Sequence, residues 1–209
     1  DNMMLLEDLT GIRAKETKAA ASVELIKAIV ALRNIKDQYE IAHLDKIMAV
    51  GYEMHTTAMR MAIDGALERD IAGAVEGVAL RNGGHVSFPV ILSKRGETLH
   101  NHDHNNILRK DDLLLVDCGF ESDMFYATDN TRVSPVGGTF TQKQKEIYEV
   151  VLAANNAVTA AVKPGIMYRE MHMLAARTIA SGMKDLGLMK GNIDDAVASV
   201  AHALFMPHG

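Results

Sequence analysis

Two kinds of hydrophobic pattern follow one another along the chain. Apolar residues such as Ile41, Leu44 and Ile47 recur at helical spacing in the first half. Short apolar or β-branched runs separated by turn residues come next, and these are typical of antiparallel strands. The predicted helices lie at 37–62, 68–80, 141–161, 168–186 and 193–200, and the predicted strands at 86–92, 99–101, 113–119 and 125–135. Helices, sheet and then helices again predict an α+β fold.

Local signals mark several of these boundaries. Thr141 is a good N-cap residue for the helix that it precedes, and Asn82-Gly83-Gly84 ends another helix because glycine adopts the left-handed cap conformation at little cost. The segment 22–30 fits a short helix or an edge strand equally well. The chain starts without a cap and stops in an apolar run, where a new strand should begin at Leu204. We therefore expect it to be part of a longer polypeptide.

Composition removes several classes of partner. The 209 residues are 48% hydrophobic and carry a net charge of -5, without a basic run that could follow a phosphate backbone, so nucleic acid is not expected as a partner. No apolar stretch approaches the ~20 residues of a membrane helix, so no membrane is expected either. Cys118 is the single cysteine, which excludes an intrachain disulfide and fits a reducing compartment. A cytoplasmic location follows as an expectation.

The candidate chemistry centres on two aspartates. Asp117 ends the run Leu113-Leu114-Leu115-Val116, which reads as a strand buried on both faces, and a carboxylate there needs a partner. If this strand and the one after it form a hairpin centred on Asp123, then Asp117 and Asp129 lie directly opposite each other. Their Cβ atoms would be ~5 Å apart, and two carboxylates at that distance repel unless a proton or a cation lies between them.

One or two divalent metal ions would resolve this repulsion. The alternative is that Asp117 lies at the rim of the sheet while Asp129 pairs with Arg132 or with a helix N-terminus. The pattern alone leaves both interpretations open. Cys118, which follows Asp117, should point to the opposite face of the strand and be buried away from any chemistry.

Histidines provide the other candidates. His100, His102 and His104 alternate along one segment, and a polar loop is the better interpretation for His102 and His104. His208 lies in a Pro-His-Gly turn after an apolar run, a place from which a side chain can be presented to a cleft.

Four segments together resemble a known family. They are 32–41 at a helix start, Val116-Asp117-Cys118-Gly119, the run 126–135 that begins Tyr126-Ala127-Thr128-Asp129, and Phe205-Met206-Pro207-His208-Gly209. In this order and spacing they resemble the Xaa-Pro aminopeptidases and Xaa-Pro dipeptidases (prolidases) of the pita-bread metallopeptidase family. The resemblance covers about 32–209.

This resemblance implies a fold, a cofactor and a reaction. The fold would be the pita-bread fold, with a dinuclear metal site whose ligands are two aspartates, a histidine and two glutamates. Asp117 and Asp129 match the two aspartates. Two ions, usually Mn²⁺ although Co²⁺ or Zn²⁺ would also suit these ligands, would hold a hydroxide that attacks the Xaa-Pro peptide bond. The substrate would be a peptide with proline at its second position.

The resemblance also assigns the two histidines. His100 lies 17 residues before Asp117, where the family has a histidine that stabilises the reacting carbonyl. His208 matches the substrate-contacting histidine of the family's His-Gly-x-x-His element, and a role as a metal ligand remains open because related methionine aminopeptidases use a His-Gly pair in that way. His100 and His208 are thus the expected catalytic and substrate-binding residues.

Two departures from the family pattern affect these expectations. The two aspartates are separated by one residue more than is usual, which a longer turn could accommodate. The second histidine and both glutamates, one of them the general base, are expected outside the 209 residues, so that the chain alone should be inactive. We expect 1–30 to be a linker or the tail of a further N-terminal domain. We expect 31–209 to be the N-terminal and central part of the catalytic domain, truncated at its C-terminal end.

Other properties and functions stay open at this point. The expected partners are the remainder of the polypeptide and a second copy in a homodimer. A non-catalytic pita-bread binding module is the main alternative function, and metal-free amidinohydrolysis of the creatinase type is another. The presence of both Asp117 and Asp129 argues against these alternatives, because the two carboxylates would repel each other without a cation between them. The sequence does not separate an aminopeptidase from a dipeptidase.

Overall fold

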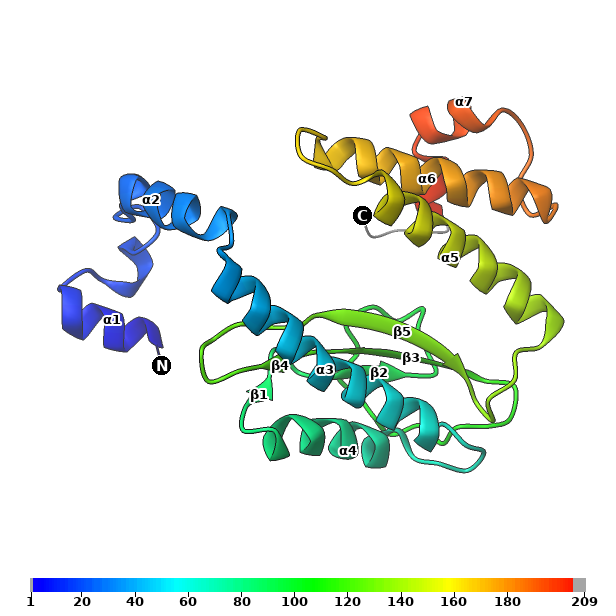
Figure 1. The fold of residues 1–209 in the computed structure, drawn as a ribbon, viewed down its shortest axis with the longest axis horizontal. Coiled ribbons are helices and arrows are strands. Elements are labelled where there is room, and N and C mark those ends of the chain that lie inside the picture. The colour runs from blue at the N-terminus through cyan, green and yellow to red at the C-terminus, as the bar shows by residue number, and fades with distance from the viewer. Residues whose placement is uncertain (1, 205–209) are drawn as a thin grey trace.

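The computed structural model describes residues 2–204, which form helices around a small β-structure (Figure 1). The α+β prediction is confirmed. The α-helices are α1 (Asn2–Thr10), α2 (Val23–Asn34), α3 (Gln38–Met61), α4 (Glu68–Arg81), α5 (Gln142–Ala161), α6 (Tyr168–Asp185) and α7 (Ile193–Ala198). Short 3-10 helices cover η1 (Ala14–Glu16) and η2 (Ala201–Leu204). The strands are β1 (His85–Val86), β2 (Ile91–Ser93), β3 (Leu113–Cys118), β4 (Phe120–Glu121) and β5 (Asn130–Pro135).

The strands form two antiparallel sheets. β3 is the central strand of a three-stranded sheet with the order β2-β3-β5, and β1 pairs with β4. Leu113 faces Pro135 at one end of the β3–β5 pair, and Cys118 faces Asn130 at the other. The central position of β3 explains its apolar composition, because it has neighbours on both sides.

The main core lies between the sheet and two helices. α3 crosses one face of the three-stranded sheet and α4 packs beside α3 (Figure 1). Asp37 caps α3 by accepting hydrogen bonds from the N–H groups of Tyr39 and Glu40, and the Glu40 side chain accepts one from Asp37 N–H in return. The fully buried residues here include Met54, Ala58, Ile71, Val75, Leu92 and Leu114.

The C-terminal helices form a separate group. α5 packs against α6, which in turn packs against α7, around small clusters that include Ala154, Ile179 and Ala180. Figure 1 shows this group above the sheet. Thr141 caps α5 as predicted, because its side chain accepts a hydrogen bond from Gln144 N–H and the Gln144 side chain accepts one from Thr141 N–H.

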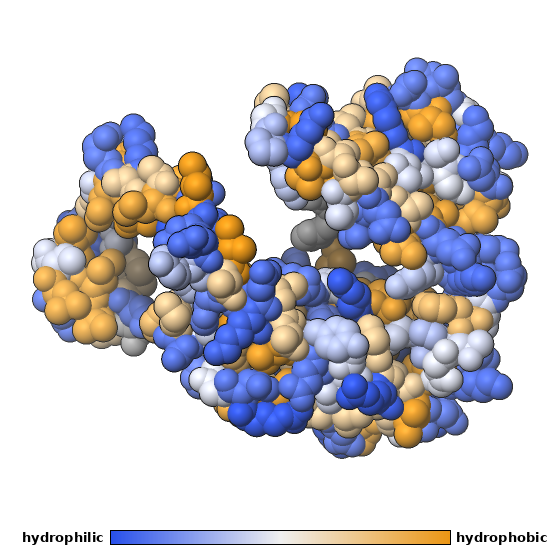
Figure 2. Space-filling model, viewed as in Figure 1, coloured by the Kyte–Doolittle hydropathy of each residue, from blue (hydrophilic) through white to orange (hydrophobic). Residues whose placement is uncertain are grey.

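The first two helices stand apart from the main core. Neither α1 nor α2 buries a residue, and apolar side chains gather over them in Figure 2. Ser22 caps α2 by accepting a hydrogen bond from Leu25 N–H, so the segment 22–30 is resolved in favour of helix. No helix within residues 2–204 combines the length and the apolar character that a membrane span requires.

Several predicted strands differ from the structure. The segment 99–101 has no strand structure, and 86–92 is divided between β1 and β2. The last strand begins at Asn130, because 122–126 form the hairpin loop and Ala127 makes only a single bridge, to Glu121. Leu204 ends a 3-10 helix instead of beginning a strand. Apolar residues in these short runs, such as Leu99, Phe125 and Leu204, are exposed and pair with no neighbouring strand, which composition alone does not predict.

Candidate metal centre

β3 presents its two faces to different surroundings. Leu114, Val116 and Cys118 are buried against the helices, and Asp117 is half-buried on the opposite face. The predicted burial on both faces is therefore wrong: one face is buried and the other is half-buried. Because side chains alternate along a strand, Asp117 points away from α3 while its neighbour Cys118 points toward it. The predicted burial of Cys118 is confirmed.

The register of the hairpin differs from the predicted one. Asp117 pairs with Thr131, and a bridge between Glu121 and Ala127 continues the same register, so the hairpin is centred on Met124 and not on Asp123. The cause is a three-residue loop closed between Ser122 and Tyr126, in which Phe125 adopts a left-handed φ of 61°. The prediction that the two aspartates are directly opposite is wrong.

The corrected register keeps the aspartates on one face. Asp129 lies across from Gly119, two residues before Thr131, and side chains two residues apart on a strand share a face. The Cβ atoms of such diagonal pairs are typically ~7 Å apart. The two carboxylates are therefore diagonal neighbours, with more room between them than the predicted opposition allows.

Gly119 makes this arrangement sterically possible. A Cβ atom at this position would lie 1.8 Å from the carbonyl oxygen of Thr128 and 2.3 Å from Ser87 Oγ. That carbonyl oxygen accepts a hydrogen bond of 2.9 Å from Ser87 Oγ, and Thr128 Oγ1 accepts one of 2.9 Å from Phe120 N–H. Contact between 119 and 128 thus places Asp129 beside the end of β3.

A pocket of about 340 Å³ brings the two aspartates together with a histidine loop. His100 is among its lining residues, as the sequence led us to expect of a residue acting on substrate. His102 lies in a loop, as predicted, but it also lines this pocket. The complete lining consists of Phe88, Pro89, Ile91, His100, His102, Asp117 and Asp129.

The two carboxylates differ in their surroundings. Asp117 Oδ1 is buried and has no hydrogen-bond partner, whereas Asp129 is exposed. No hydrogen bond or ion pair joins Asp129 to Arg132, whose Nη1 donates to the carbonyl oxygen of Thr131 at 2.7 Å. A buried carboxylate oxygen without a donor costs free energy, and a cation beside it would remove that cost. This orphaned atom fits a metal ion next to Asp117.

Comparison with known proteins places the chain in a family. Residues 42–209 match the model of metallopeptidase family M24. The chain belongs to this family. It is 34% identical over 191 residues to a protein named "Probable Xaa-Pro aminopeptidase" from Chaetomium globosum, a match that covers 90% of this chain and 32% of that one. It is 32% identical over 202 residues to the Xaa-Pro aminopeptidase of Escherichia coli K12, covering 95% of this chain and 46% of that one.

Solved structures agree with this placement in M24. A glutamate-to-alanine variant of Escherichia coli aminopeptidase P in complex with substrate matches with a TM-score of 0.78 and 33% identity, covering 82% of this chain and 40% of that chain. A zinc-substituted form of the same enzyme in complex with product matches equally well. The pita-bread prediction is thereby confirmed. The chain spans between a third and a half of the length of these M24 relatives.

The described residues do not form a complete metal site by themselves. Within residues 2–204, no group of three or more histidine, cysteine, aspartate or glutamate side chains is close enough to hold a metal ion. The carboxylate oxygens of Asp117 and Asp129 are hard donors of a kind that suits Mn²⁺, Co²⁺ or Zn²⁺. His208 lies outside the described residues, so its assignment stays a prediction.

Two further histidines, His55 and His43, contact β3 and the hairpin on the face opposite to Asp117. His55 of α3 is buried, and its Nε2 atom lies 3.6 Å from Cys118 Sγ. Burial lowers the pKa of His55 and raises the pKa of the Cys118 thiol to about 12. His43 Nε2 lies 2.8 Å from Ser122 Oγ and its ring contacts Tyr126. These contacts support the hairpin from the side opposite to Asp117.

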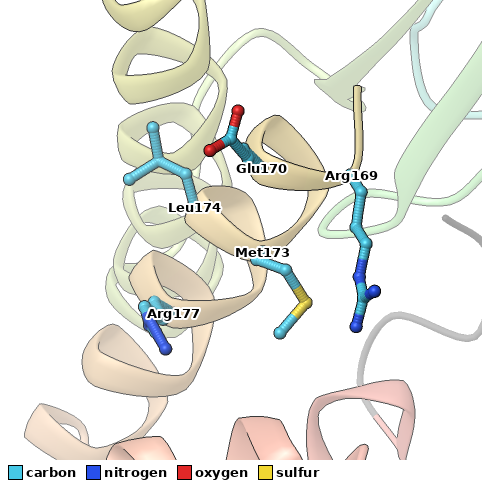
Figure 3. A pocket seen from close by; sticks show the side chains of 5 residues that line it. All are labelled: Arg169, Glu170, Met173, Leu174 and Arg177. Carbon is cyan, nitrogen blue, oxygen red and sulfur yellow. The ribbon is translucent and has the colours of Figure 1, made fainter. Parts of the chain in front are cut away.

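A second pocket is chemically unlike the aspartate site. It lies along α6, and all its lining side chains come from that helix: Arg169, Glu170, Met173, Leu174 and Arg177 (Figure 3). Arg177 is also paired with Asp194 of α7 at 3.2 Å. This pocket holds neither of the two aspartates.

Proposed function

We propose that this chain belongs to a metal-dependent exopeptidase that hydrolyses the Xaa-Pro bond of peptides, as an aminopeptidase. One observation carries the proposal: a buried, unpartnered oxygen of Asp117 lies in a pocket that also holds Asp129 and His100. The names of the M24 relatives support both the peptidase reaction and the aminopeptidase class.

Each residue of this pocket has a distinct proposed role. Asp117 and Asp129 would hold two divalent ions, with Mn²⁺ as the first candidate. When bound, these ions would supply Lewis acidity toward the water and the peptide carbonyl. His100 would donate a hydrogen bond to the carbonyl oxygen as negative charge develops on it, and His208 would contact the substrate.

The proposal requires ligands from beyond the described residues. Two carboxylates do not hold a dinuclear site by themselves, because such ions need several further ligands to bridge and cap them. We propose that a histidine and two glutamates, one of them the general base, come from further residues of the same polypeptide, and that residues 1–209 alone are inactive. A homodimer and a cytoplasmic location complete the proposal.

The test uses the intact protein and a pair of peptides. With added Mn²⁺, we expect it to hydrolyse Ala-Pro-Ala and to leave Ala-Ala-Ala largely uncleaved. Asp117→Asn should abolish this activity, whereas Asp123→Asn in the exposed hairpin turn should retain it. Cleavage of the dipeptide Ala-Pro in place of the tripeptide would make the protein a dipeptidase. Stable folding with no hydrolysis of either peptide would favour the binding module.

A further inference from the structure

Glu68 is a fully buried carboxylate in the first turn of α4, with a relative exposure of 0%. Its two oxygens accept four hydrogen bonds. Oε1 accepts from Ser93 Oγ at 3.1 Å and from Lys94 N–H at 2.7 Å. Oε2 accepts from the backbone N–H of Asn106 at 3.2 Å and from Asn106 Nδ2 at 2.9 Å. A carboxylate has about four acceptor positions, so Glu68 is saturated.

The donors lie at the two ends of one loop. Ser93 is the last residue of β2 and Lys94 follows it, while Asn106 is twelve residues further along the chain. The segment between these points, 94–106, is the loop that carries His100 and His102 to the aspartate pocket. Glu68 therefore closes the base of this histidine loop by binding both of its ends.

Backbone contacts at the same place hold one end of the loop. Glu68 N–H donates to the carbonyl oxygen of Asn106 at 3.1 Å, and Arg69 N–H donates to that of His104 at 3.0 Å. His104 Nδ1 lies 3.0 Å from the carbonyl oxygen of Leu92. These contacts hold residues 104–106, whereas Lys94 N–H is bonded by the Glu68 side chain. The Glu68 carboxylate thus joins the two ends through both of its oxygens, beside the contact between His104 and Leu92.

We propose that Glu68 is the positioning residue of the histidine loop: by joining residues 93–94 to Asn106, it sets where His100 and His102 stand relative to Asp117 and Asp129. Glu68 does not line the pocket, so it acts through the loop and not on the substrate. The role of the loop in catalysis rests on the proposed function. The closure of the loop by Glu68 rests on the four hydrogen bonds alone.

The decisive variant is Glu68→Gln. The glutamine amide has nearly the shape of the glutamate carboxylate. Its NH₂ group would replace either Oε1 or Oε2, and each of these oxygens accepts two hydrogen bonds in the wild type. Donors would then face donors at either the Ser93 end or the Asn106 end of the loop. Asn106→Ala is a gentler variant, because it removes only the bond from Nδ2. Glu76→Gln is the matched control, on the exposed side of the same helix.

The experiment uses the intact protein with Mn²⁺ as a paramagnetic probe. Ions bound by Asp117 and Asp129 should broaden the NMR signals of those aspartates and of the His100 and His102 rings. In Glu68→Gln, we expect the aspartate signals to broaden as before and the two ring signals to lose most of their broadening. Without metal, amide exchange at the disconnected end of the loop should rise about tenfold. Glu76→Gln should match the wild type in both measurements.

The outcomes separate this proposal from the proposed function. Equal ring broadening in Glu68→Gln and the wild type would overturn the positioning role, even if the variant is less stable, because a purely stabilising residue would leave the geometry of folded molecules unchanged. If Glu68→Gln does not fold, the same comparison with Asn106→Ala decides. No broadening at either aspartate of the wild type would contradict the metal site and the proposed function, and the metal-free amide-exchange comparison would then decide on Glu68 by itself.

Discussion

Thr131 of β5 lies directly across the hairpin from Asp117 of β3, and Asp129 precedes Thr131 by two residues on the same face. The two carboxylates are therefore diagonal neighbours, with Cβ atoms ~7 Å apart in a typical sheet. Paired ions in two-metal sites are ~4 Å apart, so carboxylates at the wider spacing would have room to contact such a pair. Direct opposition would leave less room between them.

The first prediction concerns metal content. Asp117→Asn and Asp129→Asn should each lower the number of bound Mn²⁺ ions per molecule of the intact protein, because each change removes an anionic oxygen ligand. Elemental analysis after dialysis against Mn²⁺ measures this number. Asp123→Asn is the control, since Asp123 is exposed in the turn of the same hairpin. Two ions per molecule in either site variant would exclude that aspartate as a ligand.

The second prediction concerns the contact that brings Asp129 beside β3. Gly119→Ala should lower the free energy of unfolding by ~1–3 kcal/mol and weaken Mn²⁺ binding, because the new methyl group would overlap the carbonyl oxygen of Thr128. Gly73→Ala on α4 meets no atom within 4 Å and should stabilise the helix by about 0.5–1 kcal/mol. Urea unfolding and metal titration of both variants provide the comparison. If Gly119→Ala bound Mn²⁺ as tightly as the wild type, the close approach would not be needed for the site.

The third prediction separates metal binding from turnover. His100→Ala should reduce kcat on an Xaa-Pro peptide by about 10²-fold in the intact protein, because a donor to the developing oxyanion is lost. The content of bound metal should stay the same. His85→Ala, an exposed histidine at β1, should change neither quantity. Loss of an ion from the His100 variant would instead make this residue a ligand.

The fourth prediction concerns the buried side of β3. At pH 8, Cys118 of the folded chain should react with a thiol reagent far more slowly than the unfolded chain in urea. The thiol is 1% exposed, and burial raises its pKa to about 12, so almost none of it is in the reactive thiolate form. Rapid stoichiometric labelling of the native chain would place Cys118 on an open face and would contradict the orientation assigned to Asp117.

Much of the architecture was predictable from local signals. The capping residue Thr141, the helical spacing of Ile41, Leu44 and Ile47, and the apolar run before Asp117 each act over a few residues, and each produced the expected element. The shared face of Asp117 and Asp129 was also predictable. The observed register differs from the predicted one by two residues, and a shift of two leaves every side chain on its original face, whereas a shift of one would move it to the other face.

The remaining details depend on contacts between distant residues. The register depends on Phe125 adopting a left-handed conformation, which the sequence does not signal because the residue is not glycine. The segment 99–101 has apolar and polar residues in a strand-like order, yet the loop is held at its base by Glu68, about thirty residues earlier. His102 enters the pocket for the same reason. The one signal that could have identified it is the alternation of His100 and His102 along the chain.

The central claim is that Asp117 and Asp129 hold the metal ions of an M24 peptidase. Crystals of the intact protein grown with Mn²⁺ test it most directly, by anomalous scattering at the manganese absorption edge. We predict two anomalous peaks within coordination distance of carboxylate oxygens of these two residues, one of them at Asp117 Oδ1. Anomalous peaks elsewhere in a protein that hydrolyses Xaa-Pro peptides, with neither aspartate in contact with an ion, would contradict the claim.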